Sequence, residues 1–326
     1  MKQRIFIWYV IICLLILVGA HIVLKMPQQE ESCFRVGIAV YDLEDTYMQD
    51  YIDQMQKMFE ENHYFGGKVY YEILDAEGNL KRQKKQFQYM CTQEFDVFLI
   101  NLVKPSSAAS ILNKAADLQI PVILFNRETK EKNLEIAETV WYVGTDAKAA
   151  GEIQGDMIMK LWREHETEMD HNQNGKLDYI LIEGEEAHFD AVRRTNGFLE
   201  HSSEMQMNQL ENISADWKRT LAYDEFSKLD KQVIQNAEAV VCHNDDMALG
   251  IYDYYQEQNL QMPVILGINH SLEMNEKIKS GEIYGTVDNN IPEQIDQISK
   301  LLEDIFQGKE SEDEKRWYST PYAGYE

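Results

Sequence analysis

The segment FRVGIAVYDLEDTYMQDYIDQMQKMF (residues 34–59) contains the pattern from which the rest of the chain is built. It begins with a short apolar run, residues 34–41, which is typical of a buried strand. A polar turn follows at residues 42–46. Beyond the turn, apolar side chains recur at helical spacing and predict one buried helix face: Tyr51, Ile52, Met55, Met58 and Phe59. A buried strand followed directly by an amphipathic helix predicts one unit of a parallel α/β sheet.

The same unit repeats along the chain. Further strand-like runs lie at residues 68–74, 96–103, 121–126, 140–145, 178–184, 239–244, 263–269 and 284–289. The last helix carries an apolar stripe of Ile291, Ile295, Ile298, Leu302 and Ile305. Because 326 residues are too many for one small core, we predict an α/β protein with two lobes of ~100 to 200 residues, with a single large α/β domain as the alternative. Right-handed crossovers then bring the loops after the strands to one edge of each sheet, where ligands bind.

The N-terminal segment is apolar enough to enter a membrane. Residues 5–24 are almost continuously apolar over 20 positions, about the length of a membrane-spanning helix. Lys2 and Arg4 precede the run and place the N-terminus in the cytoplasm. No small-x-small cleavage site follows, and Cys33 lacks the apolar residues expected before a lipidated cysteine. We therefore expect residues 1–25 to be an uncleaved anchor of an extracytoplasmic protein, with a cleaved signal segment as the alternative.

Charge and cysteine content narrow the class of protein. The net charge of −25 at pH 7 disfavours nucleic acid as a partner, because phosphate contacts need clustered Lys and Arg. The cysteines do not form the spacing pattern of a disulfide framework: Cys13, Cys33, Cys91 and Cys242.

Polar side chains, most of them short, stand after nearly every predicted strand. They are Asp42, Glu44, Asp45, Asn101, Asn126, Arg127, His188, Asp190, Arg194, Asn244, Asp245, Asp246, Asn269, His270, Asp288, Asn289 and Asn290. Any single Asp or Asn at such a position is more often a turn or cap residue than a ligand. Their repetition at one predicted edge favours a polar binding site.

Residues 170–178 begin like a calcium-binding EF-hand loop. Asp170, Asn172, Asn174, Gly175 and Asp178 occupy positions 1, 3, 5, 6 and 9 of the loop pattern. Position 12, where a Glu closes the shell, is a leucine. The pattern leaves two possibilities open: an ordinary glycine turn without metal, or a metal site whose last ligand comes from elsewhere in the chain.

Several motifs together resemble the galactose/glucose-binding protein family, the periplasmic binding proteins of type I fold. They are VGIAVYDLEDTYM, INLVKP, PVILFNRE, YVGTDAKAAGEIQGD, the D-x-N-x-N-G loop, GEEAHFDAVRRT, NDDMALG and SGEIYGTV, between about residues 35 and 322. The resemblance implies two lobes, each a parallel sheet flanked by helices, after the linker at 26–33. The N-terminal lobe would comprise residues 34–144 and 290–309, and the C-terminal lobe residues 145–289 and 310–326.

The resemblance also implies which residues contact a sugar. The hydrogen-bonding groups would be Asp45, Asn126, His188, Asp190, Arg194, Asn244 and Asn289, and the aromatic plates Tyr47 and Trp217. Asn101 has no counterpart and is expected to be a turn residue. Asn269 stands where the family usually has Asp, which predicts weaker hexose binding or an altered sugar because an amide replaces a charged acceptor. The alternative is that Asp246 or His270 restores the acceptor.

For the loop, the resemblance implies a bound calcium ion whose missing carboxylate comes from a distant Glu. The implied ligands are Asp170, Asn172, Asn174, Asp178 and Glu238, with the carbonyl of Lys176.

These expectations define a membrane-tethered sugar-binding protein, of galactose or glucose type, that closes around its ligand and presents it to an ABC permease. One alternative is a sugar-sensing co-receptor for a membrane histidine kinase or chemoreceptor. A glycoside hydrolase, with Asp45 and Asp190 as its carboxylate pair, is a weaker alternative because the similar family is not catalytic. We therefore predict that the protein is not an enzyme.

Overall fold

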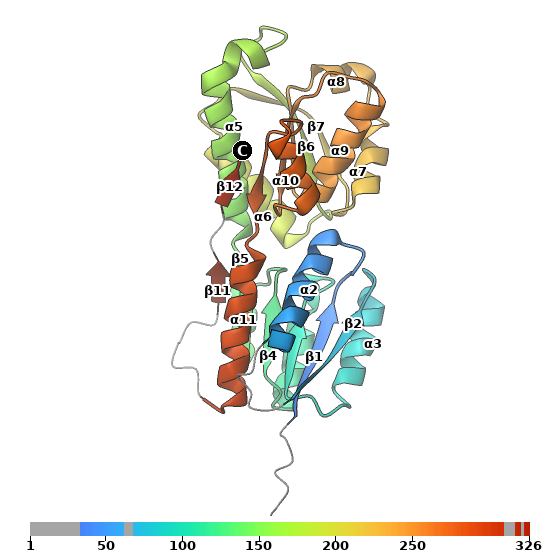
Figure 1. Cartoon of the computed structure of the whole chain (residues 1–326), viewed down its shortest axis with the longest axis vertical. Helices are drawn as coiled ribbons and strands as arrows, with labels where there is room; N and C mark the ends of the chain where they lie inside the picture. The colour runs from blue at the N-terminus through green and yellow to red at the C-terminus, as the bar shows by residue number, and fades with distance from the viewer. Residues whose placement is uncertain (1–32, 62–67, 310–316, 321–322) are drawn as a thin grey trace, which may run out of the picture.

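The computed structural model describes residues 33–61, 68–309, 317–320 and 323–326, which form two α/β lobes one above the other (Figure 1). The expected membrane anchor at residues 1–25 lies outside the described residues. None of the described helices combines the length and the apolar character that a membrane span requires.

Among the described residues, the N-terminal lobe contains a six-stranded parallel sheet in the order β11-β5-β4-β3-β1-β2. Its strands are β1 (Phe34–Val40), β2 (Val69–Asp75), β3 (Val97–Ile100), β4 (Val122–Phe125), β5 (Val140–Thr145) and β11 (Trp317–Thr320). Its helices are α2 (Thr46–Glu61), α3 (Leu80–Met90), η1 (Pro105–Ser107), α4 (Ala108–Asp117), η2 (Glu131–Ile136) and α11 (Ile291–Phe306).

The C-terminal lobe repeats this design. Its described sheet also has six strands, in the order β12-β10-β9-β8-β6-β7, and only the edge strand β12 runs antiparallel. The strands are β6 (Leu177–Glu183), β7 (Met207–Ser214), β8 (Ala239–Cys242), β9 (Val264–Ile268), β10 (Gly285–Asp288) and β12 (Ala323–Tyr325). The helices are α5 (Ala147–Met169), α6 (Phe189–His201), α7 (Arg219–Phe226), α8 (Lys231–Asn236), α9 (Asp245–Glu257) and α10 (Leu272–Lys279).

The apolar helix stripes form the core as predicted. Every predicted stripe residue of α2 is buried, and Tyr51 stacks on Phe125 of β4 with ring centroids 5.2 Å apart. Helix α11 packs beside α2 in the same core (Figure 1) and buries its stripe except for Ile305, which is half-buried. Because both faces of the central strands are covered, those strands are continuously apolar rather than alternating.

The described chain passes between the lobes at three places: between β5 and α5, between β10 and α11, and between β11 and β12. The last crossing corrects the predicted boundary, which assigned all of residues 310–326 to the C-terminal lobe. Strand β11 instead pairs in parallel with β5 of the N-terminal lobe, and Trp317 packs against Tyr142 at a centroid distance of 4.2 Å. Only β12 joins the C-terminal sheet.

Candidate functional site

A polar cavity lies between the two lobes, and all the residues expected to contact a ligand line it. It encloses about 370 Å³, counting the space open to solvent. Its walls are formed by Tyr41, Asp45, Tyr47, Asn126, Arg127, His188, Asp190, Arg194, Trp217, Asn244, Asn269 and Asn289. The carboxyl ends of parallel strands and the first turns of the following helices supply these residues, as open α/β sheets require.

The wall from the N-terminal lobe is centred on Asp45. One carboxylate oxygen of Asp45 accepts the Met48 N–H (3.1 Å) and so caps α2, and the other accepts a hydrogen bond from the Tyr41 hydroxyl. Burial raises the pKa of Asp45, although the hydrogen bonds from Tyr41 and Met48 oppose the shift. The guanidinium of Arg127 lies 3.5 Å from the centroid of the Tyr41 ring. This wall therefore offers both hydrogen-bond acceptors and a cationic donor.

Asn101 is not the turn residue that we expected. It is fully buried, its side-chain oxygen accepts the Tyr41 N–H (3.3 Å), and its amide donates to Phe125 O (3.0 Å) and Asn126 Oδ1 (3.2 Å). It thus ties together the ends of β1, β3 and β4 and orients the Asn126 side chain. Asn126 has a φ of 61°, a strained value for a residue with a Cβ.

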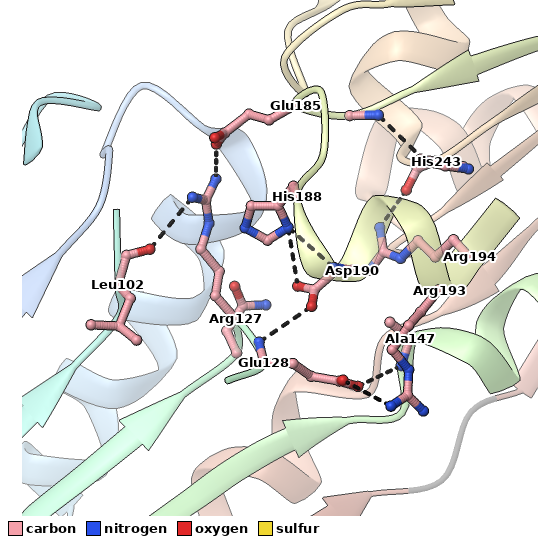
Figure 2. Close-up of polar contacts among 12 residues, drawn as sticks. Leu102, Arg127, Glu128, Ala147, Glu185, His188, Asp190, Arg193, Arg194 and His243 are labelled. Carbon is pink, nitrogen blue, oxygen red and sulfur yellow. Dashed lines mark hydrogen bonds and ion pairs between the residues drawn. The ribbon is translucent and has the colours of Figure 1, made fainter. Parts of the chain in front are cut away.

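Part of the wall from the C-terminal lobe comes from the start of α6 (Figure 2). His188 caps this helix by accepting the Asp190 N–H at Nδ1 (3.2 Å), and Asp190 and Arg194 share one helix face. Arg194 donates to the backbone oxygen of His243. Burial lowers the pKa of His188 to about 2, and the positive charges of Arg127 and Arg194 add to the shift. His188 is therefore neutral, with Nδ1 an acceptor and Nε2 the N–H donor.

Several polar atoms of this cavity are buried without a partner. Among the described residues, His188 Nε2, Arg194 Nε and Trp217 Nε1 make no hydrogen bond to the protein. Leaving a buried donor unsatisfied costs ~1 to 3 kcal/mol. Such donors in one cavity suit a ligand that carries several hydrogen-bond acceptors.

Both expected aromatic plates line the cavity. Trp217 is 9% exposed and has a left-handed backbone conformation (φ 66°). The Asn244 side-chain amide donates to the backbone oxygen of Trp217 at 2.9 Å. Its ring meets His188 edge to face at 5.6 Å and lies close to Gly184, where a Cβ would come within 2.2 Å of the indole. Tyr47 is also buried. The Trp217 ring is therefore fixed in place, which prepares a rigid apolar surface for a ligand.

Asn269 and Asn289 line the cavity beside the crossings between the lobes. Asn289 donates from Nδ2 to Asn269 Oδ1 (3.3 Å), and its own Oδ1 accepts from the Thr145 hydroxyl (2.5 Å). Asp246 and His270 do not line the cavity: Asp246 accepts from Thr46 (2.9 Å), and His270 stacks on Tyr325. Neither residue is therefore placed to replace the acceptor that an Asp would supply at position 269.

Direct contacts hold the two lobes together around the cavity. Arg127 pairs with Glu185 across the lobes at 2.7 Å. Elsewhere between the lobes, the Thr46 hydroxyl donates to Asp246 (2.9 Å) and Lys218 Nζ lies 3.7 Å from Asp42. These contacts describe a closed form of the molecule.

Two residues of the wall, Tyr41 and Arg127, were absent from the predicted contact set. The sequence does carry a signal for Arg127, which directly follows Asn126 at a strand end. Tyr41 is the last residue of an apolar run, so nothing in the pattern separates it from the core.

The loop between α5 and β6 is also built as expected from oxygen-bearing side chains. Asn172 and Asn174 donate to the Asp178 carboxylate (2.6 and 3.0 Å), and the N–H groups of Asn174 and Gly175 donate to Asp170. Glu238, far along the chain, lies against this loop. Its carboxylate accepts the N–H groups of His171 (2.8 Å) and Asp178 (2.9 Å).

This donor set fits a hard divalent cation. No described Lys or Arg forms an ion pair with Asp170, Asp178 or Glu238. Gly175 has a φ of 70°, so its lack of a Cβ permits the tight turn. In the described part of the chain, no group of three or more His, Cys, Asp or Glu side chains forms a metal site by itself. An ion here would therefore also need the amide oxygens of the two asparagines.

Comparisons with known proteins agree with this architecture. A family model described as "Periplasmic binding protein domain" matches residues 36–310. The D-galactose/methyl-galactoside binding periplasmic protein MglB of Haemophilus influenzae is 29% identical over 299 residues, 89% of this chain and 88% of that protein. A galactofuranose binding protein superposes with a TM-score of 0.77 at 20% identity, covering 90% of this chain and 94% of the other. The fructose binding periplasmic domain of a hybrid two component system gives 0.73 at 20% identity, covering 90% of each chain.

Proposed function

The chain belongs to the periplasmic binding protein domain family, and we propose that it binds a monosaccharide of galactose or glucose type between its lobes. The observation that carries this proposal is the cavity itself. It combines carboxylates, amides and guanidinium groups that are buried or half-buried with two aromatic rings and with donors that have no protein partner. A pyranose offers a ring of hydroxyls and C–H faces that pack on aromatic rings, so the chemistry of the two surfaces matches.

Each wall has a defined role in binding. The carboxylates of Asp45 and Asp190 would accept hydrogen bonds from sugar hydroxyls. Arg194 and the neutral His188, which presents its Nε2 proton, would donate to hydroxyl oxygens. Because the acceptors and donors come from both lobes, a bound sugar bridges the lobes and stabilises the closed form.

Delivery of the sugar to an ABC permease is the role that we propose. The similarity to MglB supports a transport role, and the similarity to a sensor domain keeps sugar sensing as the alternative. The two roles differ in what closure triggers. Reconstitution with a candidate ABC permease or a candidate histidine kinase would distinguish sugar uptake from phosphorylation.

We further propose that the protein is not an enzyme. The carboxylates of Asp45 and Asp190 would hold hydroxyl groups rather than act as a glycosidase pair. Incubation with nitrophenyl glycosides should release no nitrophenol, whereas measurable release that is lost in Asp190→Asn would support the hydrolase alternative.

A calcium ion is proposed for the loop at 170–178. The side chains of Asp170, Asn172, Asn174, Asp178 and Glu238 and the carbonyl of Lys176 would hold it. The ion would neutralise the carboxylates and join the loop to the start of β8, a structural role that involves no chemistry on the sugar.

We also propose that residues 1–25 tether the protein to the outer face of the cell membrane. An uncleaved anchor would keep the binding lobes near a membrane partner at high effective concentration. Mass spectrometry of the mature protein decides this point, because an intact N-terminal segment supports the anchor and a cleaved one contradicts it.

Titration calorimetry with a panel of hexoses and pentoses tests the central proposal. We expect one sugar site per chain, with D-galactose or D-glucose among the ligands. Absence of heat with every monosaccharide of the panel, in protein that melts cooperatively, would contradict it.

A further inference from the structure

Glu128 is a buried acid that lies just outside the cavity wall. It follows Asn126 and Arg127, which line the cavity, but it does not line the cavity itself. It is 1% exposed, although it belongs to a loop of the N-terminal lobe. Burial of a carboxylate is costly, so its surroundings must offset the loss of water.

The N–H and both carboxylate oxygens of Glu128 face the C-terminal lobe or the crossing into it (Figure 2). Its N–H donates to Asp190 Oδ1 (3.3 Å). Its Oε1 accepts the N–H of Ala147 (2.8 Å), the first residue of α5 after the crossing from β5. Its Oε2 lies 3.4 Å from Arg193 Nη1.

Arg193 completes this contact from α6. Its Nη2 donates to Asp146 (2.5 Å), the residue that caps α5, so one guanidinium joins the crossing segment to Glu128. Burial and the nearby Asp190 carboxylate raise the pKa of Glu128, whereas Ala147 N–H and Arg193 oppose the shift. The two carboxylates therefore disfavour each other's charge, and Arg193 stabilises the charge of both.

We propose that Glu128 and Arg193 form a latch between the lobes that also positions Asp190, so that they set how long a sugar stays bound without touching it. The proposal rests on the proposed sugar-binding function of the cavity. A sugar hydroxyl that donates to Asp190 would stabilise the charge of the Asp190 carboxylate and weaken its repulsion of Glu128. The contacts of the closed form would then be favoured. Opening of the lobes separates the α6 residues from Glu128 and breaks the latch.

The test compares full-length wild type with Glu128→Gln, Arg193→Met and the double variant. Glu204→Gln is the matched control, because Glu204 pairs with Arg163 at 3.7 Å on the exposed surface of the C-terminal lobe alone. Stopped-flow fluorescence measures association and dissociation of D-galactose. We expect each latch variant to dissociate on the order of 10-fold faster with an association rate within about 2-fold of wild type, since closure governs residence time. The double variant should be no faster than the stronger single variant, and Arg193→Lys should recover part of the loss.

A purely structural role would give a different pattern. It would lower the melting temperature of the sugar-free protein and leave the dissociation rate unchanged, and that result would overturn the latch. Additive effects of the two substitutions would overturn it as well.

Hydrogen exchange separates failure of the latch from failure of the proposed function. If wild type binds none of the sugars tested, the sugar proposal fails. The latch is then tested by the hydrogen-exchange rates of sugar-free protein. Faster exchange at residues 126–130 and 187–193 in Glu128→Gln than in wild type supports the latch, and equal exchange refutes it.

Discussion

The cavity and the loop at 170–178 both present Asp and Asn side chains, yet their hydrogen bonding differs. In the loop, the asparagine amides and backbone N–H groups donate to Asp170 and Asp178, and Glu238 is held by two further N–H groups. In the cavity, several buried donors have no partner in the described protein. The loop can satisfy much of its own hydrogen bonding, whereas the cavity depends on a ligand. The unpartnered donors of the cavity belong to His188, Arg194 and Trp217, residue types that are absent from the loop ligands.

The largest expected effect is the loss of a charged group from the cavity. Asp190→Ala should weaken sugar binding by about 2 to 5 kcal/mol, because it removes a carboxylate that accepts from the sugar and leaves the charge of the buried Arg194 without its nearby carboxylate. Titration calorimetry measures the change. Asp156→Ala is the control, since Asp156 pairs with His201 on an exposed surface of the same lobe. Equal affinity of the Asp190 variant and wild type would remove Asp190 from the binding site.

Calcium removal is the corresponding test of the loop. At free calcium about 100-fold above its Kd, the ion should stabilise the fold by roughly 2.7 kcal/mol, so a chelator should lower the melting temperature. Glu238→Gln should abolish most of this shift without changing sugar affinity. A melting temperature that does not respond to chelator would show that the loop is satisfied by its own hydrogen bonds.

Asn269 lies between these two cases, because its amide oxygen already accepts from Asn289 at 3.3 Å. Asn269→Asp places a charged acceptor in the cavity wall beside the crossings between the lobes. Hexose affinity should rise by about 1 to 2 kcal/mol, the difference between neutral and charged hydrogen bonds. Calorimetry of both forms with hexoses and pentoses checks this. Equal or weaker binding of every sugar by the Asp variant would mean that the cavity is shaped around the amide.

Replacement of the Trp217 indole tests the apolar part of the cavity. Trp217→Phe should weaken sugar binding by about 0.5 to 1.5 kcal/mol and remove most of the sugar-dependent change in tryptophan fluorescence. A fluorescence change that survives the substitution in full would contradict the stacking role.

The smallest effect concerns pH. His188 has a folded pKa lowered to about 2, while its unfolded pKa is close to 6.5, so the unfolded chain binds the proton first. The stability that comes from neutral His188 is complete above the unfolded pKa and is lost as pH falls below it. Between pH 7 and pH 6, wild type should lose on the order of 0.7 kcal/mol more than His188→Gln. Parallel stability curves for the two proteins in urea would show that His188 titrates normally.

Sequence patterns predicted the parts of the fold that bury continuous apolar runs. They missed β7, because this edge strand exposes most of its side chains and reads as polar. They also misplaced β11, whose lobe is decided by pairing with β5 rather than by any local signal. Such edge strands depend on tertiary contacts that a local pattern does not contain.

The cavity was predicted more fully than its supports. Residues that the family resemblance implied do meet at one place, but the resemblance gave no role to Asn101 or Glu128. Asn101 is buried behind the wall and orients Asn126, and Glu128 joins the wall to the other lobe. Their roles come from partners far apart in sequence, which only the folded chain brings together.

A crystal structure of the protein with D-galactose or D-glucose tests the central claim most directly. We predict one sugar between Tyr47 and Trp217, hydrogen-bonded to Asp190 and Arg194, with the lobes closed. A sugar bound elsewhere, or a cavity that holds only water in crystals of a protein that binds the sugar in solution, would contradict the account.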